Sequence, residues 1–142
     1  MRNEMIGKYD RVVLIDTENI HGECVEHIKE LNENDLLILM QSENSFKLAL
    51  EDINTIRSWR CKVKVIKIKN GIQNAMDFCL VSELSYRFAT MPKAKFYIIS
   101  NDHGYRPVVS VWRARGIDVK LFGSAECIKY DEITNMIIQT NK

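Results

Sequence analysis

The sequence predicts one α/β domain, built on a parallel β-sheet with helices on both faces. Short β-rich runs alternate with longer segments of helical periodicity, and no repeat or linker interrupts them. The 142 residues are 46% hydrophobic, which is ordinary for a globular protein and too high for a disordered one. We therefore expect a single domain over residues 1–142.

The first half of the chain predicts three strands and two helices. Residues 12–15 are apolar throughout, as in a central parallel strand that is covered on both faces. A helix is expected over about 22–31, and a second apolar strand follows over 36–40. Apolar residues at helical spacing predict a helix over 46–59, and residues 63–68 form the third expected strand.

The second half continues the alternation. Residues 75–88 predict a third helix, and residues 96–99 predict a fourth strand that is closed by Ser100. A fourth helix is expected over 107–115, because Gly116 follows it as a natural C-cap. Residues 117–122 are the fifth expected strand, and 131–139 a short last helix. Since crossovers between parallel strands are right-handed, few topologies remain.

Four lysines accompany the third expected strand: Lys62, Lys64, Lys67 and Lys69. Lysine on a strand is typical of a sheet edge, where charge prevents pairing with another molecule. The competing interpretation is a basic patch that binds a phosphate backbone. We expect the edge position and keep the patch as the alternative.

Composition narrows the class of protein further. Basic residues number 20 and acidic residues 19, a net charge of +1 that excludes a polybasic arm or an acidic tail. The apolar runs are far shorter than a membrane span, and residues 1–10 lack the apolar core of a signal peptide. Cys24, Cys61, Cys79 and Cys127 have no CxxC spacing and predict free, mostly buried thiols. We therefore expect a cytoplasmic protein without a membrane partner.

Polar side chains follow the expected strands, where open α/β sheets bind their ligands. They are carboxylates, amides and hydroxyls: Asp16, Glu18 and Asn19; Glu43; Asn74 and Asp77; Ser100 and Asp102. Any one of them could be an ordinary helix cap or turn residue. Asp16, Asp77 and Asp102 together, in three successive units, favour a shared site. Crowded carboxylates repel unless a cation intervenes, and hard oxygen ligands suit Mg²⁺ or Mn²⁺.

Three segments, residues 12–19, 74–78 and 97–105, resemble the PIN-like nucleases, closest to the bacterial branch near the NYN group. The resemblance covers nearly the whole chain in the right order. It implies a three-layer, Rossmann-like PIN fold with a five-stranded sheet of order 3-2-1-4-5. That order places the lysine-bearing third strand at an edge.

The same resemblance implies the roles of the site residues. Asp16, Asp77 and Asp102 would be the catalytic, metal-binding carboxylates. Asn19 would lie beside the metal or the scissile phosphate, with Asn74 and Ser100 as supporting residues. Many PIN-like enzymes carry another acid two positions after the last aspartate, where this chain has Gly104. Glu18 and Glu43 are the candidate replacements for that fourth acid.

Positive charge near an acidic centre would hold a nucleic-acid backbone, and Lys69 and Arg106 are the candidates. Their alternative is solvated surface charge. The sequence lacks a P-loop and a GxGxxG turn, which disfavours a nucleotide-binding enzyme. A haloacid-dehalogenase phosphatase would need aspartate in place of Glu18. A response-regulator receiver would need aspartate after the third strand, where Asn70 and Gly71 stand.

We therefore predict a ribonuclease that hydrolyses a phosphodiester with water activated by Mg²⁺ or Mn²⁺. The resemblance implies single-stranded or structured RNA as the substrate and a homodimer as the assembly. The alternative is a non-catalytic PIN-like module that binds RNA or a protein, for which Gly104 is the motive.

Overall fold

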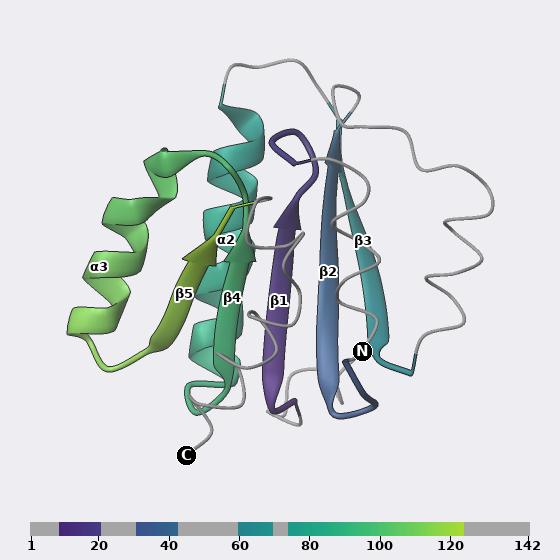
Figure 1. Cartoon of the computed structure of the whole chain (residues 1–142), viewed down its shortest axis with the longest axis vertical. Coiled ribbons are helices and arrows are strands. Elements are labelled where there is room, and N and C mark those ends of the chain that lie inside the picture. The colour runs from purple at the N-terminus through teal and green to yellow at the C-terminus, as the bar shows by residue number, and fades with distance from the viewer. Residues whose placement is uncertain (1–8, 21–30, 43–59, 70–73, 124–142) are drawn as a thin grey trace.

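The computed structural model describes residues 9–20, 31–42, 60–69 and 74–123, and all statements below rest on these residues. Their core is a five-stranded, fully parallel sheet in the order β3-β2-β1-β4-β5 (Figure 1). Its strands are β1 (Arg11–Asp16), β2 (Asp35–Ser42), β3 (Lys62–Ile68), β4 (Lys95–Ile99) and β5 (Asp118–Phe122). The predicted strand order is confirmed.

Two helices and one short turn of 3₁₀ helix complete the described elements. Helix α2 (Ala75–Thr90) connects β3 to β4, and helix α3 (Arg106–Ala114) connects β4 to β5. The 3₁₀ turn η3 (His103–Tyr105) leads directly into α3. The helices expected over 22–31, 46–59 and 131–139 lie outside the described residues. Neither described helix is long and apolar enough to cross a membrane.

Strand β1 is central because both of its faces are apolar and buried. Val12 and Leu14 contribute to a cluster on the face that α2 and α3 cover. Val13 and Ile15 contribute to a second cluster on the opposite face. All four side chains are at most 2% exposed. This burial is what the continuous apolar run predicts.

Helix α2 attaches to the sheet through an apolar stripe at helical spacing. Met76, Leu80, Leu84 and Phe88 recur every four residues and are buried against the sheet. The Phe88 ring meets Phe96 of β4 edge-on, with 4.6 Å between ring centroids. It also meets Trp112 of α3 at 4.7 Å, so the two helices pack on one face of the sheet. This packing fixes the start of α2, where Asp77 lies.

The exposure of Cys79 corrects one expectation. We expected a buried packing residue, but Cys79 is an exposed free thiol on α2, whereas Cys61 is a buried one. The stripe from Met76 to Phe88 fixes the rotation of the helix, and position 79 lies outside that stripe. Cys24 and Cys127 lie outside the described residues.

The predicted edge position of β3 is confirmed, since β3 pairs with β2 and is the end strand of the sheet. Lys62 and Lys67 are exposed, as is Lys69 just beyond the strand. Val65 on the same strand is 46% exposed. A charged edge of this kind resists edge-to-edge association.

Candidate acidic active site

The candidate site lies at the carboxyl ends of β1 and β4, which are neighbours in the sheet. Asp16 is the last residue of β1. Ser100 directly follows β4, and Asp102 lies two residues further on. The strand order reverses between β1 and β4, because β2 follows β1 on one side and β4 adjoins it on the other. Open α/β sheets bind ligands at such a switch point.

Asp16 is the most deeply buried carboxylate of this end of the sheet, with no exposed surface. Its Oδ2 atom accepts hydrogen bonds from Asn19 Nδ2 at 2.8 Å, Ser100 Oγ at 2.9 Å and the Tyr105 hydroxyl at 3.2 Å. Its Oδ1 atom accepts the backbone N–H of Glu18 at 3.1 Å. Neutral donors therefore hold this carboxylate in one orientation.

Asp77 comes from a different element and reaches the same place. It lies in the first turn of α2, where the helix dipole favours a negative charge. The Tyr105 hydroxyl lies 3.1 Å from Asp77 Oδ1 and contacts Asp16 as well. The hydroxyl carries a single proton, so it can serve both carboxylates only by sharing that proton. Tyr105 thus joins two of the three predicted aspartates.

Asp102 is half-buried and shapes the loop that carries it. Its Oδ1 atom accepts the backbone N–H of Gly104 at 2.8 Å, and its own N–H donates to Ser100 Oγ at 3.0 Å. A Cβ atom at position 104 would lie 3.0 Å from Asp102 Oδ1. Glycine at this position therefore permits the observed turn.

The carboxylates influence one another electrostatically. Burial raises the pKa of Asp77 above its usual range, and the neighbouring charges of Asp102, Asp16 and Glu18 raise it further. The hydrogen bond from Tyr105 acts in the opposite direction and lowers that pKa. Burial also raises the pKa of the Tyr105 hydroxyl, and the charges of Asp16 and Asp77 add to the effect. Tyr105 therefore remains a hydrogen-bond donor at neutral pH.

Of the two candidate fourth acids, Glu18 lies within the described residues. Glu18 belongs to the site, because it contributes to the raised pKa of Asp77 and accepts a hydrogen bond from Ser42 at the end of β2. Glu43 lies outside the described residues.

The other predicted residues lie around this centre. Asn74 caps α2 in a left-handed conformation, with φ of 65°, and its side chain makes no capping hydrogen bond. Asn19 and Ser100, the predicted supporting residues, both donate hydrogen bonds to Asp16. Arg106 and Lys69 are exposed, the first at the start of α3 and the second after β3.

Tyr105 is the residue that the sequence analysis did not assign. It is 2% exposed, and its hydroxyl bridges Asp16 and Asp77. The one signal for it in the sequence is its position directly after the Asp102–Gly104 turn. The role of its hydroxyl as a donor to both carboxylates depends on the packing of α2, which brings Asp77 within reach.

The donor chemistry of the site suits a divalent cation. Among the described residues, no ion pair involves Asp16, Glu18, Asp77 or Asp102. Buried carboxylates without a cationic partner are costly, and oxygen donors are what Mg²⁺ and Mn²⁺ prefer. In the conformation described, however, no three Asp, Glu, His or Cys side chains of residues 9–20, 31–42, 60–69 and 74–123 approach closely enough to hold a metal.

The strand order and the acidic rim define a Rossmann-like α/β domain with its site at the switch point of the sheet. The chain matches the family model described as the PIN domain over residues 10–122. It therefore belongs to the PIN domain family, whose members are generally nucleases that bind nucleic acids and use divalent metals. The predicted PIN-like resemblance is confirmed at this level. Comparisons with curated proteins and with solved structures gave no match.

Proposed function

We propose that this protein is a metal-dependent ribonuclease whose Asp16, Asp77 and Asp102 carboxylates hold Mg²⁺ or Mn²⁺. The observation that supports this most strongly is the convergence of Asp16 and Asp77 on one hydroxyl, with Asp102 close enough to raise the pKa of Asp77. When bound, such an ion lowers the pKa of a water molecule and offsets the charge of the phosphodiester.

The chain's own residues would prepare the site for that ion. Asn19 and Ser100 fix the orientation of Asp16 through their hydrogen bonds. The turn closed by Gly104 orients Asp102. Binding of a metal requires the three carboxylates to draw closer than they are in the described conformation. In this scheme the Asp77 side chain changes its orientation while α2 stays packed on the sheet.

The finer parts of the proposal follow the resemblance. We expect single-stranded or structured RNA as the substrate, and a homodimer as the assembly. Membership near the NYN group of bacterial PIN-like proteins is part of the same proposal. A cytoplasmic location is supported by the free thiols of Cys61 and Cys79.

Cleavage of labelled RNA by the purified protein tests the proposal. Wild-type protein should cut single-stranded RNA in Mg²⁺ or Mn²⁺ and not in EDTA. Asp102→Asn should fold normally, because asparagine has nearly the same size as aspartate. It should lose the activity, because the substitution removes the negative charge. DNA of the same sequence, run beside the RNA, establishes the preferred substrate. Cleavage by folded Asp102→Asn at the wild-type rate would show that the site assignment is wrong.

A non-catalytic binding module is the second candidate. One observation favours it: Gly104 stands where many PIN-like enzymes carry an acid. Titration of Mn²⁺ against the free energy of unfolding separates the candidates. A metal site adds about 1.4 kcal/mol at ten times its Kd by mass action, and a binding module adds none. Asp16→Asn is the control, since it removes the most buried ligand.

A further inference from the structure

A groove of about 420 Å³ runs between α3 and β5, along the edge of the sheet opposite to β3. Three basic side chains line it: Arg106, Arg113 and Lys120. Val109, Leu121 and Phe122 add an apolar surface. Its volume falls within the range of small-ligand pockets, which begin at about 300 Å³.

The helix geometry aligns two of the cations. Arg106 and Arg113 are seven residues apart, so they lie on the same side of α3, two turns from each other. At a rise of 1.5 Å per residue, their Cα atoms are about 10 Å apart along the helix. Lys120 of β5 also lines the groove. The positive charges therefore form a track rather than a single point.

The described residues that line the groove carry positive charge and no negative charge. None of the ion pairs among the described residues involves Arg106, Arg113 or Lys120. Arg113 Nη1 donates to the carbonyl oxygen of Val119 at 3.2 Å, which holds the guanidinium against the edge of β5. A groove with three cations and no acid attracts a polyanion.

The groove begins beside the candidate active site. Arg106 directly follows Tyr105, whose hydroxyl contacts Asp16 and Asp77. At the other wall, the carbonyl oxygen of Phe122 accepts the N–H of Ser100 at 2.9 Å, and Ser100 contacts Asp16. Both walls of the groove are thus one residue or one hydrogen bond from the acidic centre.

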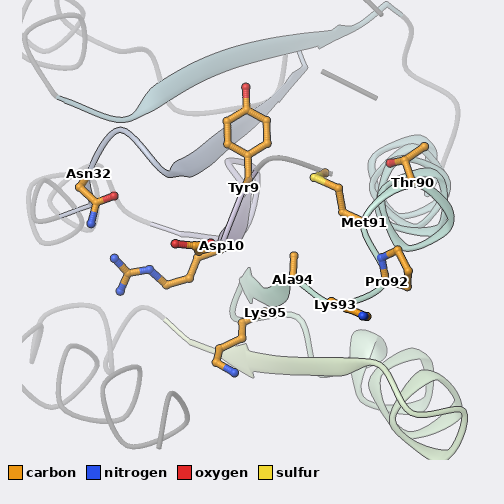
Figure 2. A pocket seen from close by; sticks show the side chains of 10 residues that line it. Tyr9, Asp10, Asn32, Thr90, Met91, Pro92, Lys93, Ala94 and Lys95 are labelled. Carbon is orange, nitrogen blue, oxygen red and sulfur yellow. The ribbon is translucent and has the colours of Figure 1, made fainter. Parts of the chain in front are cut away.

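A second, larger hollow differs from the groove in its charge. It measures about 610 Å³ and lies at the amino ends of β1 and β4, away from the acidic rim (Figure 2). Its cations are largely neutralised: Arg11 pairs with Asp35 at 2.7 Å and Lys95 with Asp118 at 3.5 Å. Asp10 lines it as well. Lys93, exposed in its lining, supplies a matched control for charge removal.

We propose that the α3–β5 groove binds the backbone of single-stranded RNA on one side of the scissile bond. Arg106, Arg113 and Lys120 contact successive phosphates, and the apolar surface of Val109 and Leu121 lies under the sugar or base. This inference rests on the proposed function for the identity of the substrate. It adds the direction in which the strand leaves the acidic centre, toward β5 and away from the lysines of β3.

Binding of a fluorescent twelve-nucleotide oligouridine in EDTA, followed by anisotropy at several salt concentrations, tests the groove without cleavage. The variants are wild type, the double variant Arg113→Gln with Lys120→Gln, and the control Lys93→Gln. Each lost phosphate contact reduces the slope of log affinity against log salt by about 0.7 for a single strand, so the double variant should lose about 1.4. If wild type and the double variant bind oligouridine equally at 1 M salt, this difference in slope corresponds to about a 25-fold loss of affinity at 0.1 M. Lys93→Gln should match wild type.

Lys120→Gln alone guards against misfolding, because the Lys120 side chain makes no hydrogen bond or ion pair with the described residues, whereas the Arg113 side chain bonds to Val119. Circular dichroism checks the fold, and the single variant should lose about 0.7 in slope, about fivefold at 0.1 M. Equal slopes for wild type and the groove variants, or absence of oligouridine binding by wild type, overturn the proposal. Groove-dependent binding by a protein that cuts no RNA in Mn²⁺ supports the groove and counts against the nuclease. RNA cleavage by a protein whose oligouridine binding does not depend on the groove residues supports the nuclease and counts against the groove.

Discussion

Tyr105→Phe is the substitution that tests the geometry of the acidic centre most specifically, because it removes one hydroxyl and keeps the buried ring. That hydroxyl lies 3.2 Å from Asp16 Oδ2 and 3.1 Å from Asp77 Oδ1. A hydrogen bond to a charged group contributes about 1.5–3 kcal/mol. Both distances are longer than the strongest bonds of this kind, and Asp16 keeps Asn19 and Ser100 as donors. We therefore expect a loss at or just below the lower limit of that range, about 1–1.5 kcal/mol.

The assay is urea unfolding in EDTA at pH 7, followed by circular dichroism. With a slope of about 2 kcal/mol per molar urea, the loss lowers the midpoint by about 0.6 M. The matched control is Tyr86→Phe, because Tyr86 lies on α2 with its side chain 42% exposed and should leave the midpoint unchanged. If Tyr105→Phe shifts the midpoint no more than Tyr86→Phe does, the hydroxyl does not bridge the two carboxylates and the described site geometry is incorrect.

Three further predictions concern single groups. The pKa of Asp77 is raised, so without metal this carboxyl group contributes most to stability below its unfolded pKa of about 3.9. That contribution declines as the pH rises through the folded pKa. Urea unfolding in EDTA should therefore find Asp77→Asn more stable than wild type at pH 7, with a stability that depends less on pH. Burial raises the pKa of the Cys61 thiol to about 11, whereas Cys79 is exposed. Maleimide should therefore modify Cys79 long before Cys61, as peptide mass spectrometry can show. Equal labelling rates for the two thiols would contradict the burial of Cys61. Gly104→Asp supplies the acid that many PIN-like enzymes have at this position. Its Cβ atom would lie 3.0 Å from Asp102 Oδ1, so we expect RNA cleavage to slow. Faster cleavage by this variant would refute the steric argument.

Local patterns were sufficient to predict the sheet. Each expected strand is present, and the central strands were the clearest, because burial on both faces requires an unbroken apolar series such as Val12 to Ile15. Strands β1 and β2 extend past those runs to polar residues whose partners are distant in the chain. Arg11 and Asp35, 24 residues apart, form a two-pronged ion pair between β1 and β2, and an apolar pattern cannot reveal such a pairing.

The sequence predicts candidate residues that the structure brings together, but it does not predict the contacts between them. Asp16, Ser100 and Asn19 could be proposed because each lies at or just after the end of a strand that the apolar pattern locates. Tyr105 was not assigned a role, because its contacts with Asp16 and Asp77 span 89 and 28 residues and depend on how α2 and the loop after β4 pack. Cys79 was misjudged for a related reason: only the packed stripe through Leu80 and Leu84 fixes which side of α2 faces the sheet.

The central claim is that Asp16, together with Asp77 and Asp102, supports metal-dependent cleavage of RNA. The most direct test is the rate at which wild type and Asp16→Asn cut an end-labelled single-stranded RNA as Mn²⁺ is added to metal-free protein. The account predicts that the wild-type rate rises from zero and saturates with Mn²⁺, while folded Asp16→Asn stays inactive throughout. A wild-type rate that does not depend on Mn²⁺, or an Asp16→Asn rate equal to that of wild type, would contradict it.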